Sequence, residues 1–204
     1  MDRERPTSDI AFTDAVKQLQ TRSGSRDTYA KVEARGGWSD RITPQLAGFI
    51  AQQNSFYLAT VNAEGQPYIQ HRGGPRGFLK PIDEQTLAMA DFRGNRQFIS
   101  QGNLLESRKA FIFLMDYANR RRIKIWGEAW MIEGDDALLQ SVMPEGYAAA
   151  PERVLLFKIS AWDPNCPQHI PRKIDADDVE VMLAERDREI AELKARIEQL
   201  QQAV

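Results

Sequence analysis

The sequence is poor in cysteine and histidine and has no long apolar run, and each shortage excludes a class of protein. The single cysteine, Cys166, cannot form an intramolecular disulfide, which fits a reducing compartment. No run of about 18 apolar residues is present, so we expect no segment to span a bilayer. The amino-terminal residues MDRERPTSD lack the apolar core of a secretory signal. We therefore expect a cytoplasmic protein with no membrane partner.

The sequence also lacks the motifs of common hydrolases and nucleoside triphosphatases. His71 and His169 are its only histidines, whereas a catalytic zinc site needs three protein ligands, so we expect no metal. Neither a GxxxxGK[ST] loop nor a GxSxG elbow with a histidine partner occurs. The net charge of −2 gives no overall attraction to nucleic acid. No catalytic residue is identified, and any anion site must be local.

Residue patterns divide the chain into three zones. Its 204 residues suit one domain with attachments better than two independent cores. Residues 1–55 read as helical, with Thr13 capping a first helix and Thr43-Pro44 starting a second after a glycine-bearing loop. Residues 56–172 are rich in strand-forming residues, and residues 173–204 form one long helix.

The middle zone is predicted to consist of short strands joined mainly by turns. Few long helices separate these strands, which favours an antiparallel barrel over a doubly wound parallel sheet. The fold class is therefore mainly β, of the α+β type. Strands are expected at 56–61, 68–72, 78–80, 86–91, 110–116, 122–132 and 154–161, and short helices at 95–101 and 135–141.

The predicted strand at 122–132 has two unlike faces. One is apolar, which is typical of a barrel interior. The other combines cations with two tryptophans, and exposed tryptophans usually mark an interface or a ligand site. We therefore expect this second face to be covered. The apolar face carries Ile123, Ile125, Ala129 and Met131, and the other carries Arg122, Lys124, Trp126, Glu128 and Trp130.

The last zone shows a heptad pattern. Isoleucine or valine at one core position and leucine at the other favours a parallel two-stranded coiled coil. Arg186 interrupts the seam, and the alternative is a solitary amphipathic helix packed on its own domain. We expect a homodimer. One core series is Leu183, Ile190, Ile197 and Val204, and the other is Val179, Arg186, Leu193 and Leu200.

Two stretches between strands combine glycine with basic side chains. The glycines of QHRGGPRG, at 70–77, either let backbone amides approach a flat or anionic ligand or simply form a wide turn. The stretch DFRGNRQ, at 91–97, leads into a predicted helix, where free amides and Arg96 would form a phosphate-binding site. The alternative is that this stretch is the capped start of a helix and that its arginines lie in solvent. The basic run at 120–124 adds positive charge or forms a solvated hairpin.

The segment from Phe56 to about Arg172 resembles the pyridoxamine 5′-phosphate oxidase-like, FMN-binding split-barrel family. The resemblance implies a six-stranded antiparallel split β-barrel, and we expect the N-terminal helical segment at 1–55 to pack on it as a flanking element. The resemblance also implies a homodimer that holds FMN in grooves between its subunits. The stretches that carry it are FYLATVNAEGQPYIQHRGGPRGF, MADFRGNRQFISQGNL, RKAFIFLMDYANRRRIKIWGEA and AWDPNCPQHIPRK.

The resemblance further implies which residues bind FMN. Residues 70–74 would line the flavin ring, and residues 95–97 would grip the phosphate, with Gln97 in place of a lysine of the family. Arg122 and Lys124 would reach across the dimer, and a C-terminal segment would close over the flavin. The full set is Gln70, His71, Arg72, Gly73, Gly74, Asn95, Arg96, Gln97, Arg122, Lys124, Trp162, Gln168 and His169.

Three functional hypotheses follow. The first is an FMN-dependent oxidoreductase that passes hydride or electrons between NADH or NADPH and a small acceptor. The second is a flavin-binding sensor or carrier without turnover. The third, a nucleic-acid-binding dimer, conflicts with the acidic balance. Vitamin B6 oxidation is not implied, because RGFLK at 76–80 and WDPNCPQHIPRK depart from the authentic oxidases. Cys166 is more typical of an inert packed thiol than of a redox group.

Overall fold

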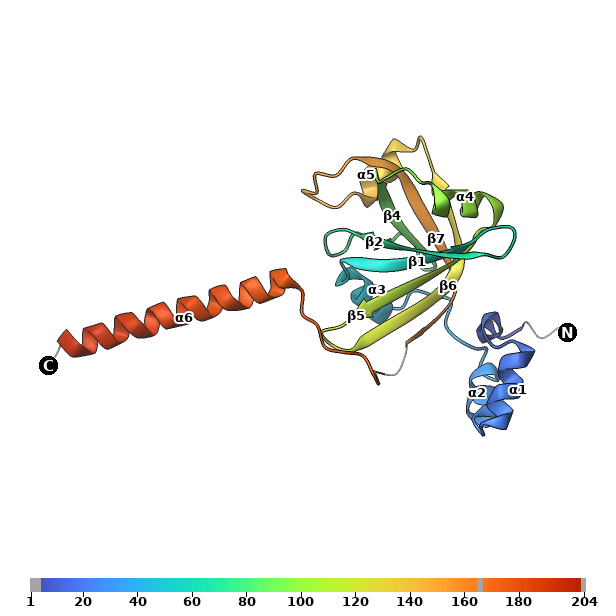
Figure 1. Ribbon diagram of the computed structural model, residues 1–204, viewed down its shortest axis with the longest axis horizontal. Coiled ribbons are helices and arrows are strands. Elements are labelled where there is room, and N and C mark those ends of the chain that lie inside the picture. The colour runs from blue at the N-terminus through green and yellow to red at the C-terminus, as the bar shows by residue number, and fades with distance from the viewer. Residues whose placement is uncertain (1–4, 165–166, 203–204) are drawn as a thin grey trace.

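The computed structural model of this chain describes residues 5–164 and 167–202, so Cys166 and Val204 lie outside the described residues. A single antiparallel sheet curls around the main core (Figure 1). Its strand order is β2-β1-β5-β6-β7-β4-β3. This confirms the mainly β fold with flanking helices. The strands are β1 (Ser55–Val61), β2 (Pro67–Gly73), β3 (Lys80–Pro81), β4 (Thr86–Phe92), β5 (Lys109–Asp116), β6 (Arg121–Ile132) and β7 (Pro151–Pro164).

The sheet has seven strands within the described residues, so the six-stranded expectation is wrong by one. The additional strand, β3, is only two residues long and pairs with β4. Its second residue, Pro81, has no amide hydrogen, which limits the backbone hydrogen bonds that β3 can form. The strand predicted at 78–80 is found at 80–81, and Phe78 and Leu79 are buried in the core instead.

The helices begin largely where their caps predict. Thr13 accepts a hydrogen bond from the Val16 amide at 3.4 Å, and Thr43 accepts one from the Leu46 amide at 3.2 Å. Both predicted starts are confirmed. The helical elements are η1 (Thr7–Ile10), α1 (Asp14–Arg22), α2 (Arg26–Glu33), α3 (Pro44–Ala51), α4 (Ile99–Glu106), α5 (Asp136–Val142) and α6 (Ala176–Gln202).

Two helices differ from the sequence prediction. Helix α2 occupies a stretch that was predicted to be a loop, and an Arg26–Glu33 ion pair joins its first and last residues. Helix α4 begins at Ile99 and not at 95, because Arg96 and Phe98 have left-handed backbone, with φ of 61° and 57°. A helix cannot propagate through such residues. Residues 95–97 therefore lie in the loop before α4.

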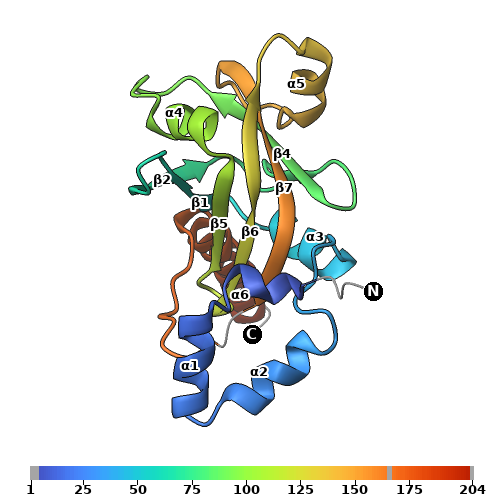
Figure 2. The same cartoon turned by 90° about the vertical axis from the view of Figure 1, so that its right-hand side faces the viewer.

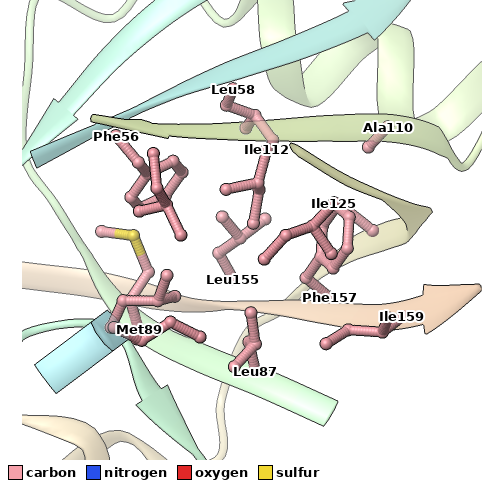
Figure 3. Close-up of a cluster of buried hydrophobic side chains, with 14 of the residues drawn as sticks. Phe56, Leu58, Leu87, Met89, Ala110, Ile112, Ile125, Leu155, Phe157 and Ile159 are labelled. Carbon is pink, nitrogen blue, oxygen red and sulfur yellow. The ribbon is translucent and has the colours of Figure 1, made fainter. Parts of the chain in front are cut away.

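The apolar side chains of the strands meet inside the barrel (Figure 3). Ile123, Ile125 and Ala129 are buried, which confirms the predicted interior face of β6. A Cβ atom at Gly127 would lie 2.1 Å from the Lys158 carbonyl oxygen. Only glycine therefore lets β6 and β7 approach this closely at the irregularity in their pairing.

The chain's own N-terminal segment covers the tryptophan-bearing face of β6. Trp38 stacks on Trp126 with ring centroids 4.9 Å apart. Phe12 packs edge-on against Trp38, and Lys124 lies 5.6 Å from the centre of the Trp38 ring. The expectation that this face is covered is thus confirmed at Trp126. Helices α1 and α2 lie beside the barrel at the end away from α4 and α5 (Figure 2).

Helix α6 leaves the barrel as a single rod (Figure 1). It is tied to the barrel near its start, where Arg76 pairs with Asp178 at 2.6 Å and with Asp175 at 3.4 Å. None of its residues is buried. The alternative of a helix packed along its own domain is therefore wrong. None of the helices within residues 5–164 and 167–202 has both the length and the apolar character needed to cross a membrane.

Candidate functional site

A small polar pocket lies where β2, β4 and the start of β7 meet the loop before α4. Its volume is about 70 Å³. Three arginines and two carboxylates line it, so positive charge is in excess. The charged lining residues are Arg72, Arg96, Arg153, Asp91 and Glu152. A pocket of this size and charge suits a small anion.

The pleat of β2 decides which of its residues reach the pocket. Burial alternates along the strand, and Tyr68, Gln70 and Arg72 belong to the partly buried series. All three line the pocket, where Gln70 also accepts a hydrogen bond from the Ser100 hydroxyl at 2.7 Å. His71 belongs to the opposite series, and its ring packs edge-on against Tyr57 at 5.6 Å.

A buried ion cluster forms one wall of the pocket. Asp91 pairs with Arg72 through one carboxylate oxygen, and its other oxygen lies 3.3 Å from Nε of Arg153. Burial raises the pKa of Asp91, and the two positive charges oppose that rise. Strands β2 and β4 share no backbone pairing. The cluster therefore ties β2 through side chains alone to β4 and β7, which are paired with each other.

A second carboxylate gathers three arginines at the mouth of the pocket. Glu152 accepts hydrogen bonds from Arg93 at 2.9 Å, Arg96 at 3.0 Å and Arg153 at 2.7 Å. These three donors lower the pKa of Glu152 to about 2. Glu152 is therefore ionised throughout the neutral range, and it holds the loop cations that a bound anion would contact.

The loop before α4 supplies backbone donors as well as charge. Phe98, the residue before α4, has an apolar side chain that accepts no hydrogen bond from the first turn of the helix. The amide groups of this turn thus remain available to an anion, and the helix dipole favours negative charge there. Asn95 accepts a hydrogen bond from the Gln97 amide at 3.2 Å, which fixes the loop between them.

The structure brings together five of the residues that the sequence implicates. Gln70, Arg72, Asn95, Arg96 and Gln97 all line the pocket. They come from one strand and one loop that are adjacent only in the folded chain.

The remaining implicated residues lie elsewhere in the single chain. Trp162 comes nine residues after Arg153 on β7, which corresponds to about 30 Å along an extended strand. Its indole donates a hydrogen bond to the Arg41 carbonyl at 2.8 Å. Lys124 pairs with Asp163 at that same end, at 2.8 Å. The residues outside the pocket are His71, Gly73, Gly74, Arg122, Lys124, Trp162, Gln168 and His169.

Gly74 has a packing explanation. A Cβ atom there would lie 2.8 Å from atoms of the Phe78 side chain. This close approach agrees with the turn alternative for the glycine-rich stretch. It neither requires nor excludes a ligand contact at the Gly74 amide.

Sequence reasoning missed Asp91, Glu152 and Arg153 as pocket residues. The last strand was predicted to begin at 154, whereas β7 begins at Pro151 and carries both Glu152 and Arg153. In the sequence, Glu152 and Arg153 are an acidic and a basic residue directly before a buried apolar run. Such a pair lies in solvent more often than in a binding site. No group of three histidine, cysteine or carboxylate side chains in the described part of the chain is arranged to hold a metal ion.

Comparison with known proteins identifies the relatives of this barrel. Residues 42–166 match the family described as Pyridoxamine 5′-phosphate oxidase. The structure of HupZ from Group A Streptococcus is 19% identical, with a TM-score of 0.50, over 65% of this chain and 99% of that chain. An FMN-binding protein from Syntrophomonas wolfei is 16% identical, with a TM-score of 0.46, over 76% of this chain and 98% of that chain. No curated protein sequence matches. At these identities the structural likeness shows the fold alone.

Proposed function

The chain belongs to the pyridoxamine 5′-phosphate oxidase family, and from this premise we propose that it binds FMN with the phosphate in the arginine pocket. The observation that carries the proposal is the convergence of Arg72, Arg96 and Arg153 on one small pocket beside the start of α4. Guanidinium groups and helix amides are the donors that phosphate groups prefer.

The residues present fit a phosphate group. Nε of Arg72 is buried and makes no hydrogen bond, which leaves a donor at the pocket wall without a partner. A volume of about 70 Å³ holds a few water molecules, so a phosphate fits. It is far below the roughly 300 Å³ of ordinary ligand pockets, so the flavin ring has to lie outside it.

We further propose that the ring lies between two copies of the chain. The outer face of β1, β2 and β5 carries half-exposed aromatic and aliphatic side chains, with Tyr57 paired to Phe113 and Ile69 paired to Ala59. Ile69 is 61% exposed. A contiguous apolar surface of this kind usually marks an interface. A second barrel on this face would supply distant residues such as Lys124, whose register partner Phe113 lies on the same face, from the other copy.

When bound, FMN would supply hydride or electron chemistry that amino-acid side chains lack. The chain's own part is to bind the phosphate, orient the ring and exclude water from it. We propose an oxidoreductase that uses NADH or NADPH and reduces a small acceptor, and its single cysteine supports a cytoplasmic location. The two departures from the authentic oxidases argue against vitamin B6 as its substrate.

A flavin carrier or sensor without turnover is the second candidate. It is favoured by the state of the pocket carboxylates, because Asp91 and Glu152 are both held in arginine ion pairs. The pKa of Glu152, about 2, lies far below neutrality, and both oxygens of Asp91 are engaged by arginines. Neither carboxylate is therefore suited to act as a general base.

The test is an absorption spectrum of the purified chain, followed by mass identification of any chromophore released on denaturation. Bound FMN supports the proposal, whereas a colourless protein that does not bind added FMN contradicts it. Under nitrogen, NADH or NADPH should bleach the visible band of an oxidoreductase. Flavin that binds but is reduced by neither donor favours the carrier.

A further inference from the structure

Helix α6 exposes an apolar stripe that its own chain leaves uncovered. The stripe runs from Val179 to Leu200, a length of about 32 Å at 1.5 Å per residue. Leu193 and Ile197 are each 54% exposed, and Leu200 is 63% exposed. A polar helix with one apolar stripe is stabilised mainly by burying that stripe against another element.

We propose that α6 pairs with α6 of a second copy as a parallel, in-register, two-stranded coiled coil. Ile190 and Ile197 occupy one core position, and Leu193 and Leu200 occupy the other. β-Branched residues at the first position and leucine at the second favour two parallel strands. The proposal does not rest on flavin binding.

The charges that flank the stripe complement a second copy of the same helix. In a parallel pair, the residue just before an isoleucine core position on one helix faces the residue five places later on the other helix. Glu189 then faces Lys194 of the second copy, and the reciprocal contact forms as well. Arg186, inside the stripe, lies against Asp187 of the second copy. A polar core layer of this kind costs stability and fixes the register.

The barrel leaves this stripe open to a second copy. Arg76 holds the carboxylates of Asp175 and Asp178, and the rest of the rod points away from the barrel (Figure 1). A two-fold pair places the same surface of both copies face to face, so a self-complementary stripe is what such an interface needs. The second copy is therefore the occupant that the pattern specifies.

Disulfide trapping in the full-length chain tests the pairing. With Cys166→Ser removing the only native cysteine, Leu200→Cys places two thiols in one core layer. Parallel pairing brings their Cα atoms within about 4.4–6.8 Å, the range that a disulfide spans. The control is Gln202→Cys, in the same terminal turn but outside the core. We expect mild oxidation to convert most of the Leu200→Cys chain, and little of the control, to a covalent dimer on a non-reducing gel.

Equal linking of both variants, or of neither, overturns the proposal. Linking between Leu183→Cys and Leu200→Cys chains, with no linking of Leu200→Cys to itself, overturns the parallel orientation. Leu193→Asp in the Leu200→Cys chain should abolish the link. Ala195→Asp, which adds the same charge outside the core, should leave it intact. Loss of the link in both aspartate variants, or its retention in both, overturns the assignment of Leu193 to the core.

Discussion

Arg96 donates a hydrogen bond to Glu152 at 3.0 Å, so the loop before α4 is tied to the start of β7. Arg93 donates to the same carboxylate oxygen at 2.9 Å. The two loop cations are thus engaged by a carboxylate of the same chain. An incoming phosphate has to share or replace that partner, and several of the predictions below depend on this competition.

Glu152→Gln should tighten FMN binding. The neutral amide competes less well for Arg93 and Arg96 and does not repel the phosphate. Because solvent-screened ion pairs are weak, we expect a gain of only about two- to fivefold in affinity. Quenching of flavin fluorescence measures it. Riboflavin, which lacks the phosphate, should bind both proteins equally. Weaker FMN binding would show that Glu152 positions the arginines instead of competing for them.

Arg96→Ala should weaken FMN binding by about tenfold to a hundredfold, because a hydrogen bond to a charged group contributes about 1.5–3 kcal/mol. The matched control is Arg22→Ala, which removes an arginine from the last turn of α1. The same fluorescence titration measures both. Unchanged affinity in Arg96→Ala would place the phosphate elsewhere.

The Glu152 ion pairs should make stability depend on pH in the acid range. The pKa of Glu152 in the folded chain, about 2, lies below its ordinary value of 4.5. Its contribution to stability is therefore complete above about pH 5 and is lost as the pH falls towards 2. The difference in urea midpoint between the wild type and Glu152→Gln should shrink over that interval. A difference that stays constant from pH 5 to pH 3 would contradict the assigned ion pairs.

Asp91→Asn should strongly destabilise the barrel. It leaves Arg72 and Arg153 buried without their shared counter-charge, and breaking a buried pair in this way costs about 3–5 kcal/mol. Urea unfolding followed by circular dichroism measures the loss. Asp27→Asn, in α2, provides the control with the same chemical change. A loss below 1 kcal/mol would mean that β2 and β4 are held together by other contacts.

The N-terminal segment should be coupled to β6 through the stacked indoles. A double-mutant cycle of Trp38→Ala and Trp126→Ala should give a coupling free energy of about 0.5–1.5 kcal/mol, the range for aromatic pairs. Urea unfolding of the four proteins measures it. Additive losses would show that the segment does not pack on β6 in solution.

The elements that the sequence predicts well are those with strong local signals. Alternation along β6 identified its buried face, and the Thr43-Pro44 start identified α3. Helix α2 was missed because its stability comes from partners distant in sequence, such as the packing of Tyr29 against Phe12. The start of α4 was misplaced because left-handed backbone at Arg96 and Phe98 is not encoded by residue type.

The site was predictable only where its residues cluster in the sequence. Arg96 and Arg72 lie in short basic, glycine-bearing stretches, and both line the pocket. Arg153 lies 81 residues after Arg72 and reaches the pocket only because β4 pairs with β7. Pairing between distant strands follows from the whole fold, so no local pattern reveals that Glu152 meets the loop before α4.

The protruding helix also affects how the size of the particle is measured. A rod of 27 residues is about 40 Å long, while a globular body of the remaining residues has a radius of gyration of about 16 Å. Such a shape has high friction for its mass and elutes early from a gel-filtration column. Calibration with spherical standards would therefore overstate the number of copies, and light scattering is the appropriate measure of molar mass.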